Sequence, residues 1–157
     1  MAEFTQERLG ALNAAYARCI DNDEVEAWPA FFQERCLYVI NTAENHAAGM
    51  QAGVIYADTR AMLRDRVSAL REANVYERHR YRHIVGLPFM LGVQDGVASV
   101  ETPFLVVRIM RDGATEVFAS GRYQDRVVEG ADGQLSFAER LVICDSRNFD
   151  TLLAIPL

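Results

Sequence analysis

In the first half of the chain, apolar residues recur at the three-to-four spacing of helices. One such stripe follows Thr5, a residue type that caps helices, and predicts a first helix; its members are Leu9, Leu12, Tyr16 and Ile20. Asp23 and Glu26 have the spacing of a capping box and predict a short second helix. Asp58 is placed to cap a third helix, whose inward positions are Leu63, Val67 and Leu70. Between the second and third helices, we expect a strand over Cys36–Thr42 and a loop over residues 43–53.

The second half is divided by three turn dipeptides, Asp95-Gly96, Asp112-Gly113 and Asp132-Gly133. Each lies between runs rich in β-branched residues, which is a strong hairpin signal. The predicted strands are His83–Val93, Val97–Met110, Thr115–Val128 and Leu135–Cys144.

Helices followed by hairpins predict an α+β fold, with the helices packed on one face of a curved, mainly antiparallel sheet. The chain has 157 residues, a length that suits one domain, so we expect residues 1–157 to form a single domain.

Charge then limits the classes of partner. The chain has 16 basic residues, all of them arginine, against 22 acidic residues, and its net charge is −6. Binding to nucleic acid or to an anionic membrane needs a basic face, so this composition argues against both. The N-terminus lacks the pattern of a signal peptide. The three cysteines, Cys19, Cys36 and Cys144, have no metal-knuckle spacing and predict free thiols in a bacterial cytoplasm.

Two catalytic patterns are weak. His79 and His83 are four residues apart and could reach one metal, but arginines surround them, which favours a structural or interface role. His83, Tyr123 and Asp125 are residue types that an acid–base site inside the fold would use. No spacing distinguishes them from ordinary sheet residues, so we prefer to interpret them as surface or sheet-pairing residues.

Two segments point instead to a protein partner. Residues 60–82 contain seven arginines and three acidic residues, a net charge of +4, while the rest of the chain carries −10. Arginine suits bidentate pairing with carboxylates on a partner surface. The chain also ends on an apolar stretch, residues 150–157, which either docks within its own domain or is buried by another subunit.

At these segments the chain resembles the small (β) subunits of Rieske non-haem iron aromatic-ring-hydroxylating dioxygenases. The resemblance rests on short motifs spread over nearly the whole length. They are Ala14-Ala15-Tyr16-Ala17, Ile20-Asp21, Trp28-Pro29, Asp65-Arg66-Val67, Arg82-His83-Ile84, Cys144-Asp145-Ser146 and the terminal Asp150 to Leu157. The family fold is a cone of helices against a curved sheet, similar to nuclear transport factor 2 and cystatin-like proteins, which agrees with the predicted class.

The resemblance implies a non-catalytic subunit with no catalytic, cofactor or metal residues of its own. The complex would be an α3β3 hexamer whose large (α) subunit carries a Rieske [2Fe-2S] cluster and mononuclear Fe(II). It would use O2 and NAD(P)H, through a reductase, to dihydroxylate an aromatic acid. Terephthalate is the expected substrate, and salicylate, anthranilate, benzoate and halobenzoate are the alternatives. The histidine and cysteine content agrees, because three histidines cannot supply both metal sites.

The residues expected to make subunit contacts are Arg78, Arg80, Arg82, His83, Asp150, Thr151, Leu152, Leu153 and Leu157. Two alternatives from other classes remain open at this point. One is a free-standing acid–base isomerase or dehydratase of the same fold, and the other is a ligand-binding module.

Overall fold

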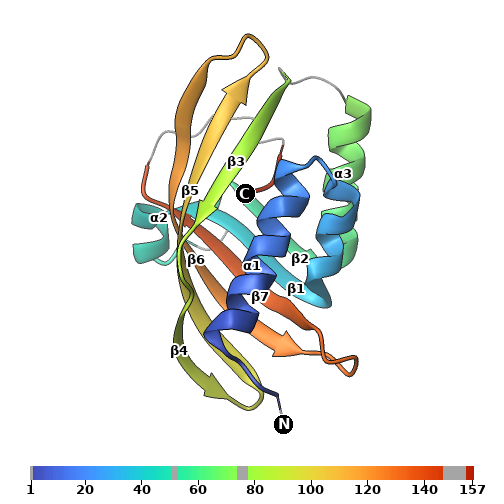
Figure 1. The fold of residues 1–157 in the computed structure, drawn as a ribbon, viewed down its shortest axis with the longest axis vertical. Coiled ribbons are helices and arrows are strands. Elements are labelled where there is room, and N and C mark those ends of the chain that lie inside the picture. The colour runs from blue at the N-terminus through green and yellow to red at the C-terminus, as the bar shows by residue number, and fades with distance from the viewer. Residues whose placement is uncertain (1, 51–52, 74–77, 147–154) are drawn as a thin grey trace.

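A curved sheet of seven strands carries the main helices on one face (Figure 1). The structure is a computed structural model that describes residues 2–50, 53–73, 78–146 and 155–157. The elements in chain order are α1 (Gln6–Asp21), η1 (Val25–Phe31), β1 (Phe32–Thr42), α2 (Ala43–Ala47), β2 (Ile55–Thr59), α3 (Arg60–Ala73), β3 (His79–Val85), β4 (Phe89–Gln94), β5 (Val97–Met110), β6 (Thr115–Glu129) and β7 (Leu135–Cys144). None of the helices in these ranges is long and apolar enough to cross a bilayer.

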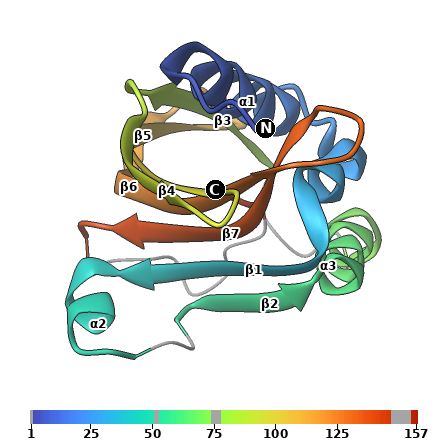
Figure 2. The same cartoon turned by 90° about the horizontal axis from the view of Figure 1, so that it is seen from below.

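The strands lie in the order β2-β1-β7-β6-β5-β3, and β4 also pairs with β5. The β1–β7 pair is parallel, and the other pairs of described strands are antiparallel. Helix α1 lies across the open side of the curved sheet (Figure 2). The predicted α+β class and the mainly antiparallel sheet are therefore confirmed.

Local chemistry explains where α1 and the hairpins form. The Thr5 hydroxyl accepts a hydrogen bond from the Arg8 N–H at 3.1 Å, so the predicted cap of α1 is confirmed. Strands β5 and β7 have the predicted bounds, and β6 is one residue longer. The glycines of all three turn dipeptides have positive φ, between 76° and 91°, as tight hairpins require.

Several expected boundaries are wrong. The short helix η1 exists, but Asp23 does not cap it: Asp23 has a φ of 59° and binds Arg71 instead. Strand β1 begins at Phe32, four residues early. Residues 43–53 include the short helix α2, and Thr42 caps it through a 3.1 Å hydrogen bond from the Asn45 N–H. Asp58 lies in strand β2, which the sequence pattern missed.

The expected strand His83–Val93 is two strands, β3 and β4, separated at Gly86. A Cβ at Gly86 would lie 2.7 Å from Pro103 Cγ, so only glycine lets the chain pass β5 here. The Gly86 N–H donates to the Pro103 carbonyl at 2.9 Å, and Pro88 cannot donate to a ladder. The chain therefore stops pairing with β5 at the end of β3 and pairs with β5 again, farther along, as the separate edge strand β4.

Candidate functional site

Along strand β3, the side chains of the arginine-rich segment alternate between the two faces of the sheet. Tyr81 and His83 point inward and are buried, whereas Arg80, Arg82 and Ile84 are exposed. This alternation follows from the pleat of a strand at the edge of the sheet.

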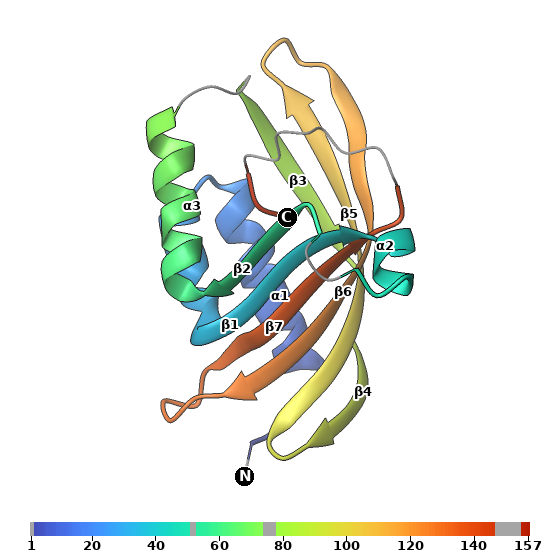
Figure 3. The same ribbon diagram turned by 180° about the vertical axis from the view of Figure 1, so that it is seen from behind.

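The outward residues of β3 join an apolar surface on the neighbouring strands. Arg82 lies opposite Val107, and Ile84 lies opposite Leu105. Across β5, Val107 is opposite Val117, whose side chain is 64 % exposed. We call Arg80, Arg82, Ile84, Leu105, Val107 and Val117 the outer patch. By the alternation along the strands, these side chains lie on the face of the sheet away from the inward Tyr81 and His83. Figure 3 views the sheet from the side away from α1. Apolar side chains flanked by guanidinium groups are typical of a protein interface.

Strand β4 is a second exposed apolar feature, and the sequence pattern did not reveal it. The β4–β5 hairpin projects from the end of the sheet opposite the β5–β6 hairpin (Figure 1), and every residue of β4 is exposed. The apolar arm, as we name it, consists of Leu87 (74 % exposed), Phe89 (66 %), Met90 (42 %), Leu91 (57 %) and Val93 (53 %). It has no charge to oppose pairing or burial, so its exposure marks an interaction site.

His83 is an internal link and not a surface residue. Its Nδ1 lies 2.6 Å from one Asp21 carboxylate oxygen, and its backbone N–H donates to the other at 2.8 Å. Both side chains are buried, and together they join the end of α1 to β3. Within the described part of the chain, no three His, Cys, Asp or Glu side chains are grouped as metal ligands.

The interior of the cone is filled at the position where an acid–base site was considered. The Arg140 side chain is fully buried and donates two hydrogen bonds, of 2.9 and 2.8 Å, to the Asp125 carboxylate. Its guanidinium also lies 4.3 Å from the ring centre of Tyr16, 3.8 Å from that of Tyr123 and 4.0 Å from that of Phe137.

In this packing, Tyr123 and Asp125 are buried against Arg140. Burial raises the pKa of the Asp125 carboxyl, and Arg140 opposes that shift. Burial also raises the pKa of the Tyr123 hydroxyl well above its ordinary value. His83 binds Asp21 instead of Asp125 or Tyr123, so the structure does not bring together the three residues considered for an acid–base site.

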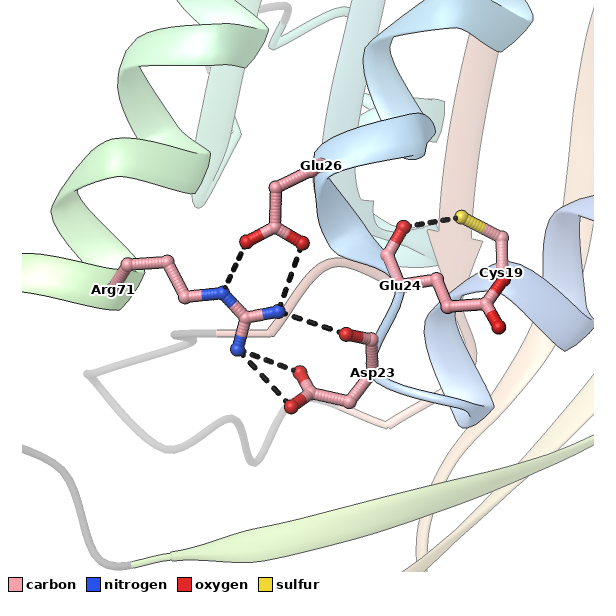
Figure 4. Close-up of polar contacts among 5 residues, drawn as sticks. All are labelled: Cys19, Asp23, Glu24, Glu26 and Arg71. Atoms are coloured by element: carbon pink, nitrogen blue, oxygen red, sulfur yellow. Dashed lines mark hydrogen bonds and ion pairs between the residues drawn. The ribbon is translucent and has the colours of Figure 1, made fainter.

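Several arginines of the basic segment make ion pairs within the chain. Arg71 binds the carboxylates of Asp23 and Glu26, with nitrogen–oxygen distances of 2.9 and 2.6 Å, and joins α3 to η1 (Figure 4). Arg60 binds the Phe32 carbonyl at 3.0 Å and the Glu34 carboxylate at 2.6 Å. Arg78, Arg80 and Arg82 are exposed and available to a partner, and one Arg82 nitrogen also lies 4.0 Å from an Asp21 carboxylate oxygen.

The end of the sequence docks within its own chain. Leu157 is fully buried, and its backbone oxygen accepts hydrogen bonds from the hydroxyls of Tyr16 at 2.7 Å and Tyr38 at 2.9 Å. The Tyr38 hydroxyl also accepts from the Leu157 N–H at 3.1 Å. The Leu157 side chain is thus unavailable to a partner. Asp150, Thr151, Leu152 and Leu153 lie outside the described residues.

The three cysteines are free and buried, as the sequence predicts. Burial raises the pKa of Cys19 and Cys36 to about 11 and that of Cys144 to about 12. A raised pKa keeps the thiols protonated at pH 8, and only the thiolate is a nucleophile. We therefore expect a disulfide reagent such as DTNB to react with the folded chain about 100-fold more slowly than with the urea-unfolded chain. Rapid reaction of even one folded thiol would contradict this.

The comparisons with known proteins agree with one another. The family model for the ring hydroxylating beta subunit matches residues 15–151. A terephthalate 1,2-dioxygenase beta subunit from a Comamonas species is 53 % identical over 96 % of this chain and 97 % of its own. The anthranilate 1,2-dioxygenase small subunit of Burkholderia cepacia is 38 % identical over 93 % of this chain and 90 % of its own.

A solved structure from Novosphingobium aromaticivorans extends the agreement to three dimensions. That protein, assigned as the beta subunit of an aromatic-ring-hydroxylating dioxygenase, is 38 % identical to this chain. It superposes with a TM-score of 0.89 over 97 % of this chain and 96 % of its own.

Proposed function

The chain belongs to the family of ring-hydroxylating dioxygenase beta subunits, and from this premise we propose that it serves a terephthalate dioxygenase as the structural small subunit. The observation that carries the proposal is the 53 % identity to a terephthalate 1,2-dioxygenase beta subunit over 96 % of the chain. Identity to the anthranilate relative is lower, at 38 %, which favours terephthalate as the substrate. The family resemblance expected from the motifs is confirmed, and the filled interior argues against an isomerase.

The partner is an α oxygenase subunit, and we place the redox chemistry on it. The described residues of this chain group no set of metal ligands and therefore do not fit a Rieske cluster or mononuclear iron. The complex would be an α3β3 hexamer in the bacterial cytoplasm, supplied with electrons by a reductase. Residues 1–157 would act as one domain. The overall reaction would convert terephthalate, O2, NAD(P)H and a proton to the cis-dihydrodiol dicarboxylate and NAD(P)+.

Two surfaces are proposed to hold the large subunits: the outer patch and the apolar arm. Both are exposed in this chain, and an exposed apolar strand such as the arm is typical of an interaction site. Of the residues expected from the sequence to contact a subunit, Arg78, Arg80 and Arg82 fit this proposal. His83 and Leu157 act inside the chain instead.

Charge reversal tests the outer patch. We expect Arg80→Glu/Arg82→Glu to weaken association with the large subunit about 10- to 100-fold, because two guanidinium groups would become carboxylates facing acidic partners. Analytical ultracentrifugation of the mixed subunits measures the effect. Arg64→Gln, on the exposed side of α3, is the matched control and should assemble normally. Unchanged assembly of the double variant would place the interface elsewhere.

Reconstitution tests the proposed function. The complex purified through this chain, supplied with reductase, NADH and O2, should convert terephthalate to its cis-dihydrodiol, whereas this chain alone should not. Conversion of anthranilate or benzoate in preference to terephthalate would overturn the substrate assignment. Turnover by this chain without a large subunit would overturn the structural role.

A further inference from the structure

The C-terminal ends of α1 and α3 lie near the start of β3 (Figure 1). Residues of these elements line a cavity of about 520 Å³. Its apolar lining includes Ile20, Leu70, Tyr81 and Ile155, all of them buried residues. The volume lies within the range of about 300–1,000 Å³ that small-molecule sites occupy. Because Arg140 and the aromatic rings fill the centre of the cone, this cavity is a separate space at its end.

The carboxylates and the arginines that line the cavity differ in whether they have polar partners among the described residues. Asp21 binds the ring and the backbone N–H of His83, at 2.6 and 2.8 Å. Asp23 binds Arg71 at 2.9 Å (Figure 4). Both carboxylates that line the cavity thus have partners within the chain.

Three further arginines line the same cavity: Arg78 directly before β3, Arg80 as the second residue of β3, and Arg111 in the turn after β5. Within the described ranges, their guanidinium groups make no ion pair or hydrogen bond. Since β3 is the last strand of its sheet, Arg80 lies where the outer patch meets the cavity. The cavity therefore combines apolar walls with three cations that have no partner among the described residues.

We propose that this cavity binds a small carboxylate with an apolar body, and specifically an aromatic carboxylate of the class on which the complex acts. A guanidinium group binds a carboxylate through two parallel hydrogen bonds, and the apolar walls would receive the ring. The identity of the ligand rests on the proposed function, whereas the cavity and its charges do not. The site would hold substrate-like acids on this subunit, apart from the reaction centre.

Isothermal titration calorimetry of the purified full chain tests the proposal, with terephthalate and benzoate as probes and uncharged benzamide as control. We expect saturable binding of the two acids at one site per chain and no binding of benzamide. Arg78→Gln/Arg111→Gln should weaken binding about tenfold, because two charge-assisted contacts become neutral. Arg64→Gln should bind as the unaltered chain does, and Arg111→Gln alone provides a second variant if the double one folds poorly.

Three results would overturn the proposal: no saturable heat up to about 10 mM acid, equal binding of benzamide, or unchanged affinity in both arginine variants with native circular dichroism. None of these outcomes bears on association with the large subunit, which ultracentrifugation measures separately. A chain that forms the complex but binds no carboxylate would refute the cavity site alone. A chain that binds carboxylate but forms no complex would refute the proposed function.

Discussion

Arg140→Ala is expected to lower the free energy of unfolding by about 3–5 kcal/mol, because it leaves the Asp125 carboxylate buried without its cation. Arg140 is fully buried and donates two hydrogen bonds to Asp125, and it also donates one of 2.5 Å to the side-chain oxygen (Oδ1) of Asn13. The variant also creates a cavity among the rings of Tyr16, Tyr123 and Phe137. Urea unfolding of the full chain, followed by circular dichroism, measures the loss.

A double replacement separates the charge effect from the packing effect. Arg140→Met/Asp125→Leu removes both charges and keeps most of the volume, so it should recover most of the stability lost by Arg140→Ala. If Arg140→Ala costs less than about 1 kcal/mol, the value of an ordinary substitution, the pair does not hold the core as described. If the double replacement is as unstable as the single one, packing dominates over charge.

Phe89→Ser/Leu91→Ser is expected to weaken association with the large subunit by about 100-fold or more, since buried apolar anchors dominate interface energies. The two side chains are 66 % and 57 % exposed in the chain alone, so the fold should tolerate the change. We expect the melting temperature to stay within about 3 °C of the original. Ultracentrifugation of the mixed subunits gives the affinity, and a thermal melt gives the stability.

Met62→Ser supplies the matched control for the apolar arm. Met62 is an exposed apolar residue, at 38 %, on α3 and outside both proposed surfaces. It should assemble normally. Full assembly of the Phe89→Ser/Leu91→Ser variant would show that the arm is exposed for another reason.

The hairpins were predictable because turn chemistry is local. An Asp-Gly pair between two apolar runs fixes a tight turn whatever lies around it, and β5 and β7 have their expected bounds. The break between β3 and β4 was not predictable in this way. It depends on the close approach of Gly86 to Pro103, a contact between segments distant in the sequence.

Arg140 was missed for a related reason. Simple alternation from the inward Phe137 would place Glu139 inward and Arg140 on the outer face of the sheet. A bulge shifts the β6–β7 register between Phe137 and Glu139. Arg140 therefore pairs with Asp125 and points into the core. Periodicity along one strand cannot show a shift that depends on its partner strand.

The candidate interface was predictable in part. The concentration of arginine before and within β3 is visible in the composition, but alternation alone did not show that His83 turns inward to bind Asp21. The apolar arm was hidden because an apolar strand is ordinarily buried, and burial is a property of the folded chain. For Leu157, docking within the chain and burial by a partner were both open, and the tyrosine hydroxyls of α1 and β1 decided for the first.

Native mass spectrometry of the tagged full chain, recovered from the cells that naturally express it, tests whether this chain is a subunit of a larger oxygenase. We expect a complex that contains this chain and a larger oxygenase subunit in equal numbers, with iron and the visible absorption of a Rieske cluster carried by the larger subunit. Recovery of this chain alone or only with copies of itself would refute the proposed subunit role, as would iron bound stoichiometrically to this chain.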